Sequence, residues 1–314
     1  MQKLNPIHVK CHVCESQESK IIAKGHDYQY NTVDDEFFWH ECNSCGHYFL
    51  NPMPSVNDLG IIYPKTLGNY CDFDDKKNFS FKIKKKLDSK RIIKLTESFK
   101  TNSRILDVGC GTGTLLDIFK ECAHNFSYYE GIEISETAAR TAENKGFEIK
   151  TGTIEEITLQ KNFYDVIFLQ QVIEHVHQPK NVIKKLYESL KINGIIVLET
   201  PSLNTWDHKL FKKGTWEGYH IPRHFNLWTT KSMKKMINEI GILNLSYNYR
   251  IKPVHWTLSL QNLLIKNKKF KSLQNALDLR SKFPILLILF TFVDLLQFLI
   301  TRKTSDIQYI IKKE

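Results

Sequence analysis

Apolar residues recur along the chain in blocks whose period changes from one stretch to the next. From residue 104 onward, short apolar and β-branched runs alternate with stretches in which apolar residues recur every three or four positions. The first pattern predicts strands and the second predicts helices, and their alternation predicts βαβ units and a parallel sheet, which is an α/β fold. The predicted strands cover residues 105–108, 128–134, 148–150, 165–169, 195–199, 243–249 and 306–311, and the predicted helices cover 115–120, 137–145, 182–190 and 231–240.

A long segment between the last two predicted strands, residues 252–304, interrupts this alternation. Within it, residues 285–300 are apolar except for Thr291, Asp294 and Gln297, which recur every three positions and therefore form one stripe along a helix. A membrane span needs about 20 apolar residues, so this run is short for one. We expect a lid or a helix that lies at a membrane interface, with a true span as the alternative.

The N-terminal part of the chain follows a different pattern. Short apolar and aromatic runs surround two cysteine pairs and end at the turn sequence Asn51-Pro52-Met53-Pro54, which predicts a small β-rich module over residues 1–54. Residues 55–100 are predicted to form a linker and an amphipathic helix. Residues 101–314 then make up the large α/β domain.

Composition excludes some classes of protein and leaves others open. The 314 residues are 42% hydrophobic and 25% charged, which is typical of a globular protein and excludes a disordered or fibrous chain. The formal net charge is +10, and residues 76–100 hold ten Lys or Arg against two acidic residues, a local charge of +8. Such a segment suits an anionic partner, either nucleic acid or a membrane surface.

The cysteines indicate a metal site. Seven cysteines are too few for a secreted disulfide framework of this length, and the first ten residues have no apolar signal-peptide core, so we expect a cytoplasmic protein. Two Cys-x-x-Cys pairs have the spacing of a tetrahedral thiolate site for structural Zn²⁺: Cys11, Cys14, Cys42 and Cys45. Free thiols or a redox pair are the alternatives. His12, His40 and His47 are alternative ligands.

A buried strand that runs into a glycine-rich turn, residues 105–113, is the strongest signal for a ligand. Glycine lets the backbone pass close to a bound molecule. A dinucleotide site would need its third glycine at position 114, where the chain has Thr114. Glu133 lies twenty residues beyond Gly113 at the end of the next predicted strand, where a carboxylate can accept hydrogen bonds from both hydroxyls of a ribose. The pattern therefore favours an adenosine ligand that is not a dinucleotide, and a chance turn is the alternative.

With these motifs the sequence resembles the class I S-adenosylmethionine (SAM)-dependent methyltransferases over about residues 100–313. The resemblance implies a Rossmann-like seven-strand sheet with helices on both faces and a helical insertion, residues 252–304, above the active site. Many relatives carry an Asp where this chain has Thr153, so Glu155 becomes the candidate for adenine recognition. The residues that the resemblance assigns to SAM are Asp107, Gly109, Cys110, Gly111, Gly113, Glu133, Ile134, Thr153, Ile154, Glu155 and Gln170.

Two histidine-containing segments follow predicted strands, at the sheet edge where α/β folds bind ligands. The pair Glu174-His175 is similar to one in sugar C-methyltransferases and ubiquinone O-methyltransferases, and imidazole suits a general base near neutral pH, so His175 is the candidate base. The alternative is a histidine that caps a helix or binds the cofactor. The second segment, residues 216–225, resembles the substrate loop of the same branch and offers His220 and His224 as substrate contacts; an ordinary packed loop is the alternative.

The cysteine-rich segment 42–54 with Tyr63 resembles the zinc-binding N-terminal part of methyltransferases that modify sugars and related metabolites. This implies methyl transfer to a small-molecule acceptor: a sugar, a glycan precursor or a lipid-linked metabolite. Tyr63 or Tyr70 would contact it, and aromatic packing at the domain junction is the alternative. Residues 266–300 join a lysine cluster to the apolar helix and are expected to contact the inner face of a membrane, unless the lysines are simply a solvated charge run.

Two other functions compete with this one. Some zinc-bearing relatives modify ribosomal RNA, but the chain has no aromatic-rich basic stretch suited to base stacking, so we do not expect nucleic acid as a partner. The third hypothesis is a SAM-binding module without catalysis. The sequence does not predict an oligomeric state.

Overall fold

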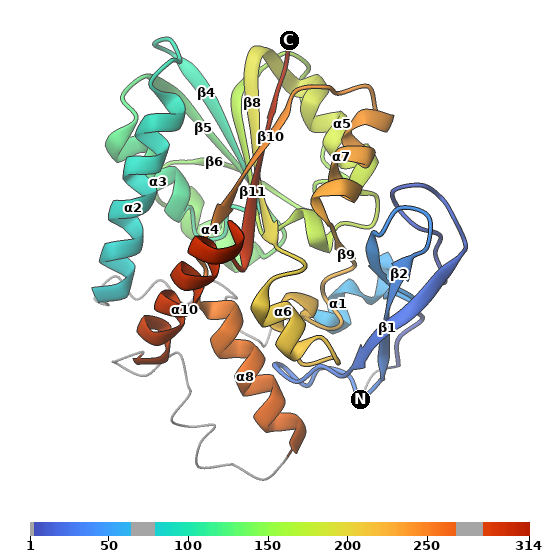
Figure 1. Cartoon of the computed structure of the whole chain (residues 1–314). Helices are drawn as coiled ribbons and strands as arrows, with labels where there is room; N and C mark the ends of the chain where they lie inside the picture. The colour runs from blue at the N-terminus through green and yellow to red at the C-terminus, as the bar shows by residue number, and fades with distance from the viewer. Residues whose placement is uncertain (1–2, 64–78, 268–284) are drawn as a thin grey trace. The chain divides into compact units, whose positions relative to one another are not determined.

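The computed structural model of the chain describes residues 3–63, 79–267 and 285–314 (Figure 1), and gives the backbone alone for residues 79–84 and 285. The chain divides into two compact units. The first comprises Met1–Pro64, Ile173–Lys180 and Glu199–Gln308, and the second comprises Lys65–Val172, Asn181–Leu198 and Tyr309–Glu314.

A seven-stranded sheet has the strand order β10-β11-β8-β7-β4-β5-β6. Strand β4 pairs in parallel with β5 and with β7, and β5 pairs in parallel with β6. This arrangement confirms the predicted α/β fold. The strands are β4 (Ser103–Val108), β5 (Phe126–Glu133), β6 (Glu148–Thr151), β7 (Tyr164–Gln170), β8 (Leu190–Pro201), β10 (Leu245–Arg250) and β11 (Asp306–Lys312).

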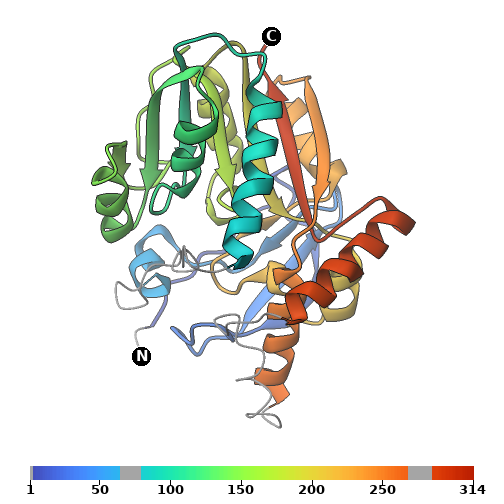
Figure 2. The same cartoon turned by 90° about the vertical axis from the view of Figure 1, so that its left-hand side faces the viewer.

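Helices of the second unit pack on the strands through apolar side chains. α2 and α3 lie next to each other and share a core with the strands (Figures 1 and 2). Ile92 of α2 and Phe119 of α3 are buried in that core, whereas Leu87 of α2 is exposed, so the predicted apolar stripe of α2 is only partly covered. The helices are α2 (Phe79–Thr96), α3 (Thr114–Cys122), α4 (Glu136–Glu143) and α5 (Pro179–Ser189).

The strand predicted over residues 195–199 begins earlier in the structure, because β8 already starts at Leu190. Asn193 has φ +65°, a left-handed conformation that asparagine tolerates better than most residues, and its N–H donates to the Lys313 carbonyl at 2.9 Å. The strand therefore continues through Asn193 despite its positive φ.

A small sheet with the order β1-β2-β3-β9 forms part of the first unit. Its strands are β1 (Ser19–Gly25), β2 (Phe37–Cys42), β3 (Tyr48–Leu50) and β9 (Asn226–Leu227), and the three pairings are antiparallel. Trp39 and Leu50 share one apolar core with Phe211, Phe225 and Trp256. The sequence predicts a separate module over residues 1–54. In the structure its core is shared with residues 203–256.

The remaining helices belong to the first unit, and two of them, α8 and α10, lie next to each other (Figures 1 and 2). The structure confirms a helix over the apolar run at 285–300. None of the helices in the described ranges is long and apolar enough to cross a membrane. The helices are η1 (Val56–Asp58), α1 (Leu59–Ile62), η3 (Ile173–His175), α6 (Trp206–Phe211), η4 (Glu217–Tyr219), α7 (Thr230–Glu239), α8 (Val254–Asn267) and α10 (Ile285–Thr301).

Candidate functional site

The glycine-rich turn joins the end of β4 to the start of α3. Gly109, Gly111 and Gly113 have φ angles of +74°, +53° and +80°, in the left-handed region that favours glycine. A Cβ at position 109 would lie 2.5 Å from Cγ2 of Val172, so no side chain fits there. Both the backbone conformation and the available space therefore require glycine, as expected for a turn that a ligand approaches closely.

Glu133, at the end of β5, holds this turn in place. Its Oε2 accepts the N–H of Gly111 at 2.8 Å, and its Oε1 accepts the N–H of Ser135 at 2.8 Å. Burial raises the pKa of Glu133, although these N–H groups favour its charged form. Burial, together with the charge of Glu133, raises the pKa of Asp107 well above its ordinary range. A ligand with hydroxyl groups and a positive charge, such as SAM, fits this pair of carboxyl groups.

The other residues assigned to the cofactor follow the ends of parallel strands and so lie along one edge of the sheet. Ile134, after β5, is an exposed apolar side chain beside Glu133. Thr153, after β6, donates to the exposed carboxylate of Glu156 at 2.9 Å, and Ile154 is buried. Cys110 is buried, and Glu155 and Gln170 are partly buried at the same edge. Their roles toward SAM stay predictions.

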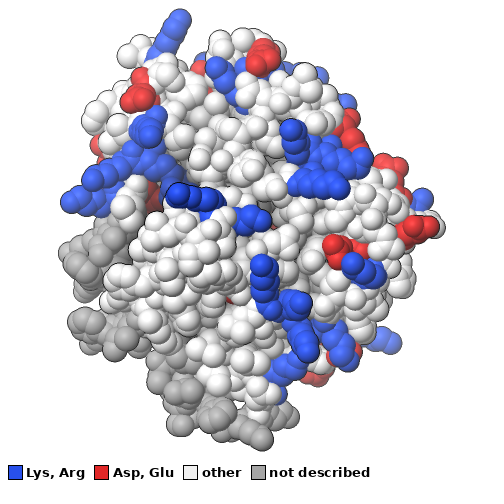
Figure 3. Space-filling model, in the orientation of Figure 1, with Lys and Arg blue, Asp and Glu red and all other residues white. Residues whose placement is uncertain are grey.

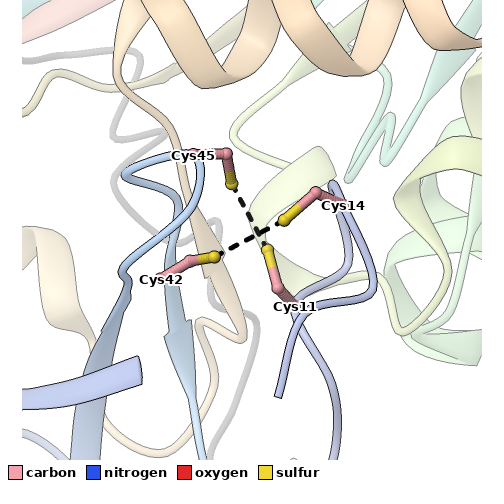
Figure 4. Close-up of side chains that lie close together, drawn as sticks. All are labelled: Cys11, Cys14, Cys42 and Cys45. Atoms are coloured by element: carbon pink, nitrogen blue, oxygen red, sulfur yellow. Dashed lines mark hydrogen bonds between the residues drawn. The ribbon is translucent and has the colours of Figure 1, made fainter. Parts of the chain in front are cut away.

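The four paired cysteines point their sulfur atoms toward one another (Figure 4). The Sγ atoms of Cys11 and Cys45 are 3.5 Å apart, and so are those of Cys14 and Cys42. Tetrahedral Zn²⁺ with Zn–S bonds of about 2.3 Å would separate its sulfurs by about 3.8 Å. The cluster therefore fits a structural zinc ion that leaves no position open for a substrate.

The nearby histidines are engaged elsewhere. Nδ1 of His12 and Nε2 of His47 both lie within hydrogen-bond distance of Oδ1 of Asn226, at 2.6 and 3.1 Å. His40 contacts Ser19 through Nδ1 at 3.0 Å. Asn226 follows the predicted substrate loop and also donates to the Val176 carbonyl. No sequence pattern singled it out, because its partners lie far away along the chain.

Three predicted histidines come together in the first unit: His175, His220 and His224. The ring centroids of His175 and His224 are 4.5 Å apart, and those of His220 and His224 are 4.9 Å apart. One nitrogen from each ring lies within 4.8 Å of the others. The Phe225 N–H donates to the Glu174 carbonyl at 2.7 Å, which fastens the turn that carries His175 to the loop that carries the other two.

Hydrogen bonds fix the tautomer of two of these rings. Nδ1 of His175 lies 3.0 Å from the Arg223 carbonyl and 2.8 Å from Oη of Tyr63, and Nδ1 of His224 lies 2.8 Å from the Gly218 carbonyl. Since a carbonyl only accepts, Nδ1 carries the proton in both rings and Nε2 keeps a lone pair. Burial lowers the pKa of His175 to about 4 and of His220 to about 3, and takes that of His224 well below its usual value.

Glu174 approaches His224 rather than its neighbour in sequence, His175. Its Oε1 lies 4.0 Å from Nε2 of His224, and both carboxylate oxygens are buried without a hydrogen-bond partner among the described residues. Burial raises the pKa of Glu174 to about 8, so the group is mostly protonated at neutral pH. The predicted pair Glu174-His175 thus separates into a His175–Tyr63 contact and a Glu174–His224 approach. Tyr70, the other predicted substrate contact, lies outside the described residues.

Two buried ion pairs hold the loop at 217–224. Arg223 binds both carboxylate oxygens of Asp27 at 3.0 Å, and this charge lowers the pKa of Asp27 despite burial. Glu217 bonds to Nδ1 of His255 on α8. Although burial opposes both charges, the pair lowers the pKa of Glu217 to about 2 and raises that of His255 to about 10. Asp27 and His255 carried no sequence signal, because an ion pair between distant segments leaves none.

A small hollow opens beside His220, with room for about one water molecule. Gln29 lines it, and Nε2 of Gln29 is buried without a partner in the part of the chain that is described. The lining residues are His26, Tyr28, Gln29, Gly214, Trp216, Tyr219, His220, Ile221 and Asn262.

Residues 82–247, more than half of the chain, match the sequence model of a family described as a methyltransferase domain. The chain belongs to this methyltransferase family. The ubiquinone biosynthesis O-methyltransferase of Rickettsia prowazekii is 33% identical over 133 residues, which are 40% of this chain and 52% of that protein. Its counterpart in Rickettsia typhi is 28% identical over 214 residues, 59% of this chain and 81% of that protein.

Other relatives broaden the comparison. The malonyl-[acyl-carrier protein] O-methyltransferase of Calditerrivibrio nitroreducens is 31% identical over 106 residues, 31% of this chain and 37% of that protein. The chain spans about half the length, or less, of most of the curated relatives it matches. Phosphoethanolamine N-methyltransferase 2 of Haemonchus contortus, solved with SAM, has a TM-score of 0.53 at 14% identity and covers 94% of this chain and 68% of its own. At that identity the likeness concerns the fold.

Proposed function

We propose that this methyltransferase-family protein transfers the methyl group of SAM to a hydroxyl group of a small acceptor, a sugar, glycan precursor or lipid-linked metabolite. The observation that carries the proposal is the glycine turn after β4, whose Gly111 N–H is held by the carboxylate of Glu133. Relatives named as O-methyltransferases support oxygen as the atom that is methylated.

Cofactor binding is assigned to the edge of the sheet at the ends of β4, β5 and β6. Glu133 would hold the ribose hydroxyls, with Ile134 against the adenine and Glu155 in reach of its amino group. Asp107, whose carboxyl group is buried beside Glu133, would be charged once a cation lies next to it. When bound, SAM supplies a methyl group activated by the positive charge on its sulfur.

The acceptor is placed at the three histidines. In an in-line displacement the acceptor oxygen forms a bond to the methyl carbon while the carbon–sulfur bond breaks, so the oxygen must lose its proton. His175 can take that proton on Nε2, since its Nδ1–H is bonded to the Arg223 carbonyl. His224, Glu174 and His220 would position the acceptor.

The zinc module and the cellular location complete the proposal. The geometry of the four cysteines supports a structural Zn²⁺ of the kind found in the sugar-modifying branch. We place the protein in the cytoplasm, with a lipid-linked acceptor drawn from the inner face of the membrane. The apolar helix α10 provides the reason for preferring a lipid-linked acceptor.

The first test is calorimetric titration of the zinc-loaded full chain with S-adenosylhomocysteine, together with incubation of a cell extract with isotope-labelled SAM. We expect micromolar or tighter binding and label in the lipid or polar fraction. Label in RNA would favour an RNA methyltransferase, and binding without label in any fraction would favour a non-catalytic module. An absence of binding would overturn the assignment of the glycine turn.

A further inference from the structure

Helix α10 turns its polar side chains inward. Asp294 and Gln297 are fully buried. Asp294 accepts hydrogen bonds from the Lys252 N–H at 3.0 Å, from Nε1 of Trp256 at 3.1 Å and from Oγ of Ser305 at 2.7 Å. Gln297 accepts the backbone N–H of Trp206. The polar stripe seen in the sequence is therefore an internal attachment to α8 and its neighbours.

The apolar side chains of α10 consequently face outward. Seven large ones are between 38% and 66% exposed: Ile288, Leu289, Phe292, Leu295, Leu296, Leu299 and Ile300. Their spacing of three and four residues places them on one side of the helix. The surface over α10 is accordingly free of charged side chains in the space-filling view (Figure 3). Phe290, by contrast, stacks on Trp256 at 5.5 Å and belongs to the core.

This polarity is the reverse of that of an ordinary surface helix, which buries its apolar side and exposes its polar side. Hydrogen bonds of the buried polar side chains attach the inner side of α10 to the first unit, whereas its outer apolar side chains remain largely exposed. A continuous apolar surface of this kind marks a site of interaction. The partner that covers the apolar side of α10 would itself be apolar.

Charge decides between a lipid surface and another protein. Lys266 lies in the last turn of α8, and Arg302 and Lys303 directly follow α10. Among the described residues from 251 to 303, Asp294 is the acidic residue, and it is buried. An apolar side flanked by cations is the arrangement of a helix that lies in the plane of an anionic membrane surface, each cation adding about 1 kcal/mol there.

We infer that the exposed side of α10 docks this protein on an anionic lipid surface, with the helix parallel to the membrane plane. The inference deepens the proposed function, because a docked enzyme would meet an acceptor that is anchored in the same surface.

The test is co-sedimentation of the zinc-loaded full chain with vesicles of phosphatidylcholine alone and of phosphatidylcholine with 30% phosphatidylglycerol. The double variant Phe292→Glu/Leu299→Glu places two charges on the docking side. Its matched control is Leu243→Glu, at a residue that is 82% exposed outside α10. We expect the wild type and Leu243→Glu to bind the anionic vesicles at least tenfold more strongly than the neutral ones. The double variant should lose roughly tenfold or more of that affinity.

Circular dichroism and titration with S-adenosylhomocysteine on the same variants keep the two proposals apart. Unchanged helicity and unchanged ligand affinity in the double variant would show that docking alone was removed. Wild-type protein that ignores anionic vesicles, or equal losses in Leu243→Glu and the double variant, would overturn the inference. A wild-type dimer that the double variant dissociates, without vesicle binding, would assign the surface to a second copy of the chain instead.

Discussion

The three clustered imidazoles are chemically unequal although each is neutral at pH 7. His175 and His224 have Nδ1 committed to a carbonyl, whereas Nε2 of His220 is buried without a partner among the described residues. His224 turns its Nε2 toward the protonated Glu174. That leaves His175, steadied by Tyr63, as the ring best arranged to receive a proton from an acceptor.

His175→Ala should therefore reduce turnover by roughly 10²-fold or more while leaving the affinity for S-adenosylhomocysteine unchanged. The measurement is the initial rate of methyl transfer with labelled SAM and the responsive cell fraction, paired with calorimetry. His124→Ala, at an exposed histidine outside the cluster, is the control and should behave as wild type. Full activity in His175→Ala would contradict the assignment of His175 as the general base.

Asp27→Asn should lower the free energy of unfolding by about 3 kcal/mol, because it leaves the charge of Arg223 buried without its partner. Arg223 lowers the pKa of Asp27 from 3.8, so the contribution is complete above pH 3.8 and is lost as the pH falls through the lowered value. Urea unfolding of both proteins should show the gap at pH 7 and its decrease below pH 3.8. Asp34→Asn, at an exposed carboxylate, should show no gap.

Some of these residues were predictable and others were not, for a physical reason. Cys11, Cys14, Gly111 and Glu133 lie in patterns that are local in sequence or at a fixed offset, because a tight turn or a strand end sets their spacing. Asp27, Asn226 and His255 act on residues more than thirty positions away. Folding brings those partners together, and neither residue type nor spacing in the sequence predicts the contact.

At the scale of elements, the turn between β4 and α3 joins a strand to a helix at the edge of the sheet where we propose that SAM binds. The strand delivers the chain at the sheet edge, and three left-handed glycines let α3 start immediately. The predicted strands and helices of this region agree with the observed ones because apolar periodicity is strong in a buried sheet. At Asn193 the prediction and the structure differ. An asparagine tolerates a positive φ, so β8 runs through this residue instead of beginning after it.

Gly109→Ala and Gly146→Ala separate the two reasons for glycine in such turns. Both residues have positive φ, +74° and +84°, so both variants carry a similar backbone strain of about 1 kcal/mol. Only at position 109 would the Cβ meet another atom, Cγ2 of Val172 at 2.5 Å; at 146 nothing lies within 4 Å. We expect Gly109→Ala to lose at least tenfold in affinity for S-adenosylhomocysteine by calorimetry, and Gly146→Ala to keep it. Equal affinities would show that the turn adapts.

At the scale of the whole molecule, the N-terminal module is part of a larger unit. Its sheet takes its fourth strand, β9, from residues 226–227, and its core includes Phe225 and Trp256. The sequence indicated a small β-rich module but not this sharing, because a boundary is judged from turns and composition along the chain whereas a core forms across it. The order of the seven-stranded sheet, by contrast, agrees with the α/β fold that the sequence predicts.

Zinc removal should therefore affect the whole first unit. Cys45→Ser is expected to lower zinc content below one ion per chain and to lower the melting temperature by several degrees, because the two turns that carry the cysteines lose their common ligand. Elemental analysis and calorimetric melting check this. Cys122→Ser, at a cysteine outside the cluster, should keep the zinc and the melting temperature. Normal zinc content in Cys45→Ser would contradict the assigned ligand set.

Asn226 connects the turns of the paired cysteines to the loop that carries His224. Its side chain contacts His12 and His47, each next to or near one of these cysteines, and it follows His224 by two residues. On the proposed function, a zinc ion at the four thiolates would therefore also steady the loop that carries His224, which is assigned to the acceptor. We expect the metal supply of the cell to set how well this enzyme works, so that zinc starvation would switch off methylation before the protein itself disappears.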